Sequence, residues 1–253
     1  LDHGNGTTCK TADKVLKELG CEIINISKEI DGTFPNRSPE PKKSNMSYLQ
    51  KRVVETKADF GCAFDGDGDR SVFVDNKGRF LDGSKMSCLF SKELLKKNKH
   101  AYIVASVDMS SALKTVVEEN NGNLVWCPVG MKNISQGLLE NKGMFAGEVS
   151  SHFYFNDFYA FSDGILSCAK LAEILCNKKE TFSQLIDKLP SYPIKHGKFK
   201  AKNHKIKFKK FEEIKKELSK NYKTNTIDGV KFFLNKTDWV LIRPSNTEPV
   251  IRI

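Results

Sequence analysis

The sequence has no apolar run approaching the ~20 residues that a membrane-spanning helix needs, so no such helix is expected. Its seven cysteines are odd in number, scattered, and include no C-x-x-C pair. This usage argues against a disulfide framework and against the common zinc sites. We therefore expect reduced, mostly buried cysteines in a cytoplasmic protein.

Arginine is nearly absent from the most basic part of the chain, residues 195–223, although the net charge of the sequence is +10. The lysines of this stretch alternate with apolar residues and then change to helical spacing. That change predicts a solvated strand face followed by an amphipathic helix. With few arginines and few stacking aromatic residues, the stretch matches RNA-binding surfaces poorly. We expect no nucleic-acid partner and no membrane partner, and an anionic small substrate that uses part of the positive charge.

The sequence does contain a tight acidic loop, within "DFGCAFDGDGDRSVFVD" at residues 59–75, between two apolar runs that predict strands. Asp65, Asp67 and Asp69 disfavour one another's ionised form unless a cation lies among them. Mg²⁺ prefers such oxygen ligands, and the intervening glycines let the backbone turn tightly. An EF-hand loop requires Gly and Glu where Arg70 and Asn76 stand, so that motif is excluded. A charged hairpin turn is the alternative to a magnesium site.

The order of the predicted elements indicates an α/β protein with a smaller end domain of another type. Up to residue 64, strands alternate with helices, as in a parallel sheet whose ligands lie beyond the carboxyl ends of the strands. Strand 21–26 and strand 58–64 belong to this pattern, and Asp65 directly follows the second. The same rhythm resumes in a second α/β unit, and an α+β domain ends the chain. The predicted domains are residues 1–82, 83–190 and 191–253.

Two further loops carry polar groups after predicted strands. In "AGEVSSHFYF", residues 146–155, Glu148, Ser150 and His152 alternate, so in an extended chain their side chains face one side. Such a set suits vicinal sugar hydroxyls, although the stretch by itself favours one polar face of a β-hairpin, with His152 as a surface histidine. "RPSNTEP", residues 243–249, offers a guanidinium, hydroxyls and an amide, which suit a phosphate. A capped turn is the alternative there.

Taken together and in this order, several stretches of the sequence resemble the α-D-phosphohexomutases, the family of phosphomannomutase, phosphoglucomutase and phosphoglucosamine mutase. The matching stretches are "DHGNG", "DGTFPNRSPEP", "DFGCAFDGDGDR", "GEVSSHFYF", "DGILSCAKLAEIL" and "RPSNTEPVIRI". The resemblance implies a four-domain enzyme in which each domain gives one loop to a central cleft. It also implies phosphoryl transfer between C6 and C1 of a hexose phosphate, through a phosphoserine and a 1,6-bisphosphate. Hexose 1-phosphate and hexose 6-phosphate would be the substrates. Mg²⁺ would be the cofactor, and glucose or mannose 1,6-bisphosphate the activator and intermediate.

The resemblance further implies roles for individual residues. Asp65, Asp67 and Asp69 would hold Mg²⁺. The catalytic residues would be Arg70, His152 and Lys132. The sugar would be bound by Gly147, Glu148, Ser150 and His152, with Gly147 allowing close approach. The phosphate that is not transferred would be bound by Arg243, Ser245, Asn246 and Thr247.

The sequence departs from the family pattern in two places. It has no serine in a loop of the T-A-S-H-N-P type, and Ser151 stands where many members have Gly. The chain also starts at Leu1 without a methionine and stops within an apolar alternation. We therefore expect the C-terminal portion of a larger phosphomannomutase/phosphoglucomutase, inactive by itself because the family's nucleophile is missing. Phosphoglucosamine mutase is the alternative enzyme, and a non-catalytic phosphosugar- or nucleic-acid-binding module is the alternative from another class.

Overall fold

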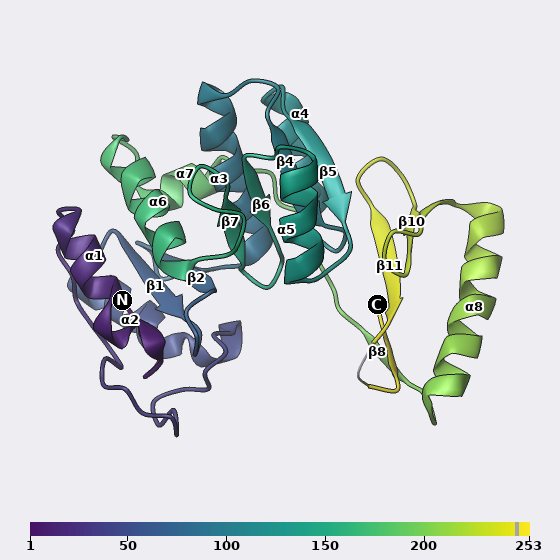
Figure 1. Ribbon diagram of the computed structural model, residues 1–253, viewed down its shortest axis with the longest axis horizontal. Coiled ribbons are helices and arrows are strands. Elements are labelled where there is room, and N and C mark those ends of the chain that lie inside the picture. The colour runs from purple at the N-terminus through teal and green to yellow at the C-terminus, as the bar shows by residue number, and fades with distance from the viewer. Residues whose placement is uncertain (246–247) are drawn as a thin grey trace.

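The computed structural model describes residues 1–245 and 248–253, which form three sheets in succession along the chain (Figure 1). The first sheet has the antiparallel order β1-β2-β3. The elements up to its end are η1 (Thr7–Lys10), α1 (Ala12–Glu18), η2 (Lys43–Asn45), α2 (Ser47–Thr56), β1 (Phe60–Phe64), β2 (Ser71–Asp75) and β3 (Phe80–Leu81).

The second sheet has the order β5-β4-β6-β7, in which β5, β4 and β6 are parallel and β7 is antiparallel to β6. Helices cover this sheet, as an α/β unit requires (Figure 1). Its elements are α3 (Gly83–Lys97), β4 (Tyr102–Ser106), α4 (Ser111–Glu119), β5 (Asn123–Cys127), α5 (Met131–Glu140), β6 (Phe145–Gly147), β7 (Phe153–Phe155), α6 (Gly164–Cys176) and α7 (Phe182–Asp187). Side-chain caps mark the helix starts: Asp82 accepts from Lys85 N–H and Asp163 from Leu166 N–H.

The third sheet is antiparallel, with the order β8-β12-β11-β10-β9 and one long helix against it. Its elements are β8 (Lys198–Lys200), α8 (His204–Asn221), β9 (Lys223–Asn225), β10 (Val230–Phe233), β11 (Trp239–Pro244) and β12 (Val250–Arg252). Asn203 caps α8 by accepting from Ile206 N–H, so the helix begins within the part of residues 195–223 whose alternating lysines predicted a solvated strand face. The expected class, two α/β units followed by a small α+β unit, is confirmed.

One hydrophobic core runs through both α/β units. Phe64 and Phe73 from the first sheet belong to the same buried cluster as Phe90 of α3 and Phe153 of β7. Ring centroids of Phe73 lie 6.2 Å from Phe90 and 6.3 Å from Phe153. The third unit has a separate core, in which Phe211 of α8 packs against the sheet. The first two units are therefore held together by shared apolar burial, whereas the third docks through a smaller set of contacts.

The predicted strand at residues 21–26 is wrong as a regular strand. Only Ile26 pairs, in a single parallel bridge to Asp2, and Asp2 makes a second parallel bridge to Ala63. Backbone hydrogen bonds from Ile26 to Leu1 and from His3 to Ile26 still align this segment with the start of the chain. The parallel part of the first unit is thus reduced to isolated bridges.

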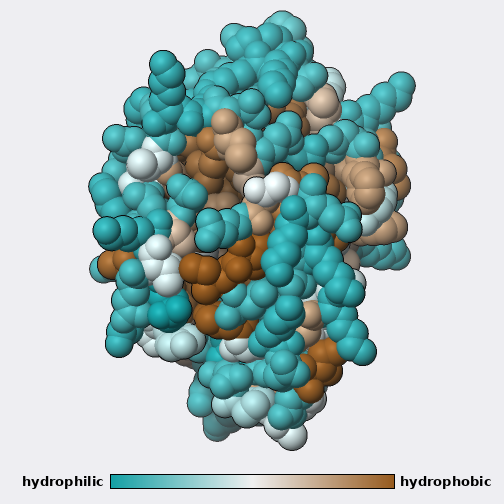
Figure 2. All heavy atoms as spheres, turned by 90° about the vertical axis from the view of Figure 1, so that its left-hand side faces the viewer, coloured by the Kyte–Doolittle hydropathy of each residue, from teal (hydrophilic) through white to brown (hydrophobic). Residues whose placement is uncertain are grey.

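The end of the molecule formed by the first unit carries apolar side chains on its surface. Figure 2 faces this end and shows a brown apolar area bordered by hydrophilic residues. Exposed apolar residues of the first unit are Val15, Leu19, Ile24, Ile30, Tyr48 and Val54. Among the described residues, no helix combines the length and the apolar character that crossing a membrane requires.

Candidate functional site

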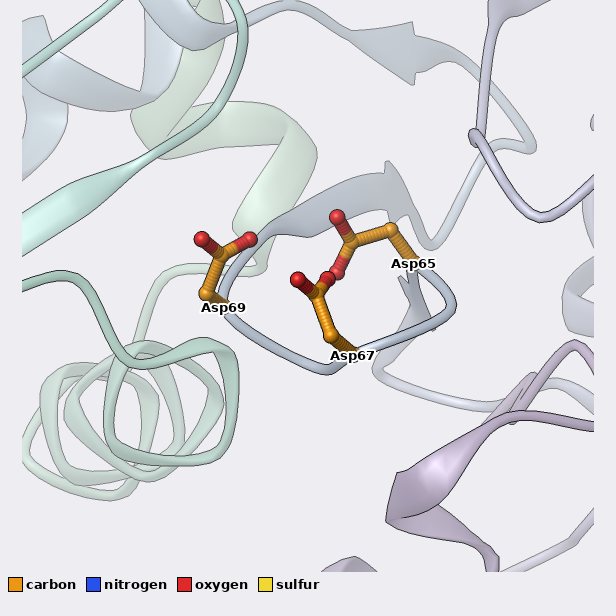
Figure 3. Close-up of side chains that lie close together, drawn as sticks. All are labelled: Asp65, Asp67 and Asp69. Atoms are coloured by element: carbon orange, nitrogen blue, oxygen red, sulfur yellow. The ribbon is translucent and has the colours of Figure 1, made fainter. Parts of the chain in front are cut away.

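The acidic loop directly follows β1 and folds back on itself into β2. Asp65 Oδ1 accepts the N–H groups of Gly68 and Arg70, at 3.1 Å each, and Gly68 has a φ of +84°. Glycine tolerates this left-handed backbone without the steric cost that other residues meet. The tight turn places carboxylate oxygens of Asp65, Asp67 and Asp69 within 4.8 Å of one another. Figure 3 shows the three side chains projecting from one loop toward a common space.

The donor set of this loop fits a hard divalent cation. Three carboxylates converge within one loop, and oxygen ligands with room for substrate phosphate are what Mg²⁺ requires. Asp65 is already oriented by its backbone donors and by Arg70 Nε, 2.5 Å from its Oδ2. Within the described part of the chain, the carboxylate of Asp67 has no hydrogen-bond or ion-pair partner. Asp65 thus anchors the loop, while Asp67 keeps its oxygens available to an ion.

Arg70 is held as a cation at the edge of the acidic loop. Its Nε donates to Asp65 and its Nη1 to Glu40 Oε1, at 3.2 Å. Partial burial opposes the charge, but hydrogen bonds and attraction from Asp65 and Glu40 outweigh burial, and the pKa of Arg70 is raised. Glu40 comes from the proline-rich segment and has no sequence motif that links it to the loop, so sequence reasoning missed it.

Residues 148–152 form a tight turn between the antiparallel strands β6 and β7, so the stretch is not extended throughout. Glu148 N–H donates to His152 O at 3.0 Å, and Ser151 N–H donates back to Glu148 O at 3.0 Å. The turn nevertheless brings the predicted side chains together. Ser150 Oγ lies 2.8 Å from His152 Nδ1, and Glu148 Oε2 lies 3.4 Å from the same nitrogen. A hydroxyl, a carboxylate and an imidazole therefore form one cluster.

His152 joins this cluster to the acidic loop. Its Nε2 lies 3.4 Å from Asp69 Oδ1, and its backbone pairs with Arg70 in an antiparallel bridge. The start of α6 also contacts the acidic loop, because Gly164 N–H donates to Gly68 O at 3.0 Å. A Cβ at Gly164 would lie 2.7 Å from Arg70 O and 2.8 Å from Gly68 O. The two loops, predicted separately, belong to one site.

Glu148 is fixed from two sides. Gly130 N–H donates to its Oε1 and the Tyr154 hydroxyl to its Oε2, at 3.0 Å each. Burial of Tyr154, and then the negative charge of Glu148, raise the pKa of the tyrosine, which stays a hydrogen-bond donor. Tyr154 was not predicted, since an aromatic residue in an apolar strand gives no signal beyond packing. The carboxylate of Glu148 is thus held in a single orientation.

Gly147 and Lys132 are placed differently from the three side chains of the turn. Gly147 is buried, and a Cβ there would lie 2.2 Å from Ser87 Oγ on α3. Its close approach in this structure is therefore to α3. Lys132 is exposed in the first turn of α5, next to the Gly130 that binds Glu148. Within the described residues its ammonium has no carboxylate within 4.0 Å. The roles expected for both residues stay predictions.

The third predicted loop begins in the last two residues of β11, Arg243 and Pro244, and continues beyond the strand. Arg243 Nη1 donates to Asp228 Oδ2 at 2.8 Å, and the same oxygen accepts Val129 N–H at 3.1 Å. Since Val129 precedes Gly130, these contacts connect the Arg243 loop to Glu148. Ser245 is buried, and its Oγ accepts Glu248 N–H at 3.3 Å. Asn246 and Thr247, also predicted to bind phosphate, lie outside the described residues.

Ser151 pays a conformational cost in the β6–β7 turn, because its φ is +70°. A left-handed backbone destabilises a residue with a Cβ by about 1–2 kcal/mol. Glycine avoids this steric cost, but it loses more conformational entropy on folding, so the net gain is smaller. We expect Ser151→Gly to raise the free energy of unfolding by roughly 0.5–1 kcal/mol. Urea denaturation measures the difference, with Ser150→Gly as the matched control, which should not stabilise. Equal or lower stability of Ser151→Gly would contradict the assigned strain.

Three family models match the chain, and together they cover almost all of it. They are described as phosphoglucomutase/phosphomannomutase alpha/beta/alpha domain II at residues 1–78, alpha/beta/alpha domain III at residues 82–192, and the C-terminal domain at residues 198–253.

Curated relatives and solved structures agree with the family models. A phosphoglucomutase/phosphomannomutase of Thermococcus kodakarensis is 37% identical over 258 residues, which cover 100% of this chain and 55% of that protein. A probable phosphoglucosamine mutase of Methanopyrus kandleri is 34% identical, with coverage of 100% and 56%. The crystal structure of a phosphoglucomutase/phosphomannomutase family protein from Burkholderia thailandensis superimposes with a TM-score of 0.90 at 31% identity, covering 99% of this chain and 54% of that one. The chain spans about half the length of the relatives it matches.

Proposed function

The chain belongs to the phosphoglucomutase/phosphomannomutase family, and on this premise we propose that it forms the metal, sugar and phosphate loops of a phosphohexomutase. The reaction would be the interconversion of a hexose 1-phosphate and a hexose 6-phosphate through an enzyme-bound 1,6-bisphosphate. The observation that carries the proposal is the 3.4 Å contact between Asp69 Oδ1 and His152 Nε2. It brings the candidate metal ligands and the candidate sugar-binding residues together in one place.

The candidate metal ligands of this site are Asp65, Asp67 and Asp69. Mg²⁺ held there would neutralise charge on the phosphoryl oxygens, and phosphoryl transfer depends chiefly on such stabilisation and on positioning. Arg70, kept cationic by Asp65 and Glu40, adds a second positive group at the same point. Its hydrogen bonds to two carboxylates fix its direction before a ligand arrives.

The sugar would be oriented by Glu148, Ser150 and His152. The carboxylate accepts hydrogen bonds from sugar hydroxyls, while the serine hydroxyl and the imidazole can each donate or accept one. Because Gly130 and Tyr154 already hold Glu148, a ligand does not have to order it. His152, between Glu148 and Asp69, is placed to exchange a proton with a hydroxyl near the metal ligands.

The Arg243 loop would hold the phosphate that is not being transferred. A cycle that uses a bisphosphate needs one distal site able to accept either end of the sugar, and a guanidinium and a hydroxyl can bind both phosphates alike.

The phosphoryl-carrying serine of the family is not found in this sequence. We therefore propose that these 253 residues bind phosphosugars without converting them.

Calorimetric titration of the 253-residue chain with glucose 1,6-bisphosphate and MgCl₂ tests this function. We expect saturable binding that Arg243→Ala weakens about ten- to hundredfold, since a charge-assisted contact to phosphate is lost. Arg52→Ala is the matched control, because Arg52 pairs on the surface of α2 with Glu55, and its affinity should equal that of the wild type. Absence of saturable binding, or equal loss in both variants, would contradict the proposal.

The sugar that the site prefers is a separate choice within the same function. Relatives of similar identity are named both phosphoglucomutase/phosphomannomutase and probable phosphoglucosamine mutase. The Asn of "RPSNTEP" and the stretch "SSHFYF" favour the glucose and mannose branch. Displacement of the bisphosphate by mannose 1-phosphate, glucose 1-phosphate and glucosamine 1-phosphate ranks the three sugars directly.

A further inference from the structure

A buried lysine lies directly beneath the Arg243 loop. Lys207, on the first turn of α8, has a side chain with no exposed surface. Its ammonium donates to the backbone carbonyls of Ser245 and Glu248, the latter at 3.0 Å, and to His204 Nδ1 at 3.0 Å. These three acceptors use all three N–H groups of the ammonium. The lysine therefore ties together the two sides of the loop between Ser245 and Glu248.

The charge of Lys207 is not neutralised by a carboxylate. Within residues 1–245 and 248–253, no carboxylate oxygen lies within 4.0 Å of its Nζ, and residues 246 and 247 are Asn and Thr. The acid of the loop itself, Glu248, pairs with Arg252 instead, at 3.3 Å. A buried cation without a counter-ion is costly, so an anion that approaches the loop would relieve that cost.

Arg243 alone does not give the loop a net positive charge. Its guanidinium is paired with Asp228 at 2.8 Å, so the pair is neutral before any ligand binds. Lys207 then supplies a positive charge that no carboxylate of the described residues pairs with, and it holds the carbonyl groups of Ser245 and Glu248.

We infer that Lys207 is a positioning residue of the phosphate loop: it fixes the loop backbone through two carbonyls and supplies the buried charge that a sugar phosphate compensates. This inference rests on the proposed function of the same loop. It adds a residue that lies 36 positions before Arg243, on a helix whose lysine spacing indicated only a solvated face.

The experiment compares Lys207→Met, Lys207→Arg and Lys209→Met in the 253-residue chain, with glucose 1,6-bisphosphate and MgCl₂ as the probe. Lys209 is an exposed lysine of the same helix turn and serves as the matched control. We expect Lys207→Met to weaken binding about ten- to hundredfold, because both the charge and the carbonyl contacts are lost. Lys207→Arg keeps the positive charge but places a larger, planar group in a fully buried position, so it should lose less affinity than Lys207→Met. Lys209→Met should bind as the wild type does.

Two further readouts separate positioning from simple structural support. The affinity of the wild type should fall more steeply with ionic strength than that of Lys207→Met, because the variant has one positive charge fewer beneath the phosphate loop. Thermal melting without ligand checks that each variant folds.

Wild-type affinity in Lys207→Met, while Arg243→Ala still abolishes binding, would overturn the inference and leave the proposed function standing. If Lys207→Arg and Lys207→Met lost affinity equally, and the salt dependence of binding matched that of the wild type, the role of the charge would be overturned. Absence of binding by the wild-type chain would overturn the proposed function and the inference together.

Discussion

Replacement of Arg37 by Met is expected to lower the free energy of unfolding by about 3–5 kcal/mol, because it leaves a buried carboxylate without its partner. Arg37 Nε lies 2.7 Å from Asp2 Oδ2, and both residues are buried, at 8% and 4% exposure. The same guanidinium donates to Phe64 O at 2.6 Å. Phe64 is the last residue of β1, so the pair secures the strand end from which the acidic loop departs.

Urea denaturation followed by far-ultraviolet circular dichroism measures the effect of Arg37→Met. Arg52→Met is the matched control, because Arg52 makes a partly exposed pair with Glu55, and such pairs contribute about 0–1 kcal/mol. The double variant Asp2→Asn with Arg37→Met should recover part of the loss, since no unpaired charge remains buried. A loss below about 1 kcal/mol in Arg37→Met would show that the pair does not stabilise the strand end.

Raising the pH from 7 to 10 is expected to strengthen the docking of the third unit, through Lys231 on β10. This lysine is buried, donates to Val107 O at 2.8 Å, and lies 3.8 Å from the ring centroid of Trp239 and 4.8 Å from that of Trp126. Burial lowers its pKa to about 8, against a smaller opposing attraction from Asp108. The charged form is therefore disfavoured in the folded protein.

The direction of the pH effect follows from the two pKa values. The pKa of Lys231 is about 8 in the folded protein, against an ordinary value of 10.5. Between these two pH values the unfolded chain binds the proton of Lys231 more fully than the folded protein does. Stability then rises with pH. The penalty on the folded state is present in full below pH 8, and roughly 2–3 kcal/mol of it is removed by pH 10.

The two tryptophans of the chain, Trp126 and Trp239, both face Lys231, so their fluorescence reports on this interface during denaturation. The measured quantity is the difference in unfolding free energy between the wild type and Lys231→Met, at pH 7 and at pH 10. Subtraction removes the titration of cysteines and tyrosines, which both proteins share. A difference that does not change with pH would contradict the shifted pKa.

The sequence alone was enough to predict the part of the candidate site that is formed by neighbouring residues. Asp65, Asp67 and Asp69 lie within five positions, so their convergence needed only a tight turn after an apolar strand, and the structure has both. Local pattern and local structure agree there.

The sequence alone could not predict the contacts between segments that lie far apart in the chain. Nothing in the residues near Lys207 indicated that it is buried, because a lysine among many lysines is typical of a solvated face. Lys231 lies among apolar residues, but a lysine is so rarely buried that its position gave no such signal either. The alternation of polar residues at 148–152 left an extended strand and a β-hairpin both open, and nothing in it indicated that Ser151 adopts a positive φ. Residues 21–26 have the composition of a strand but make only one bridge, because the neighbouring segment at Asp2 is itself short.

The contact of His152 and Gly164 with the acidic loop has a consequence for the order of assembly. The loop is synthesised before either residue, so these contacts to the loop form only when the second unit has folded against the first. Closing so long a stretch of chain is entropically costly and slow. Metal affinity should therefore appear late in refolding, at the same rate as the signal for docking of the second unit. Because ligand binding stabilises only the folded form, a cation at the three aspartates would in turn slow the separation of the two units.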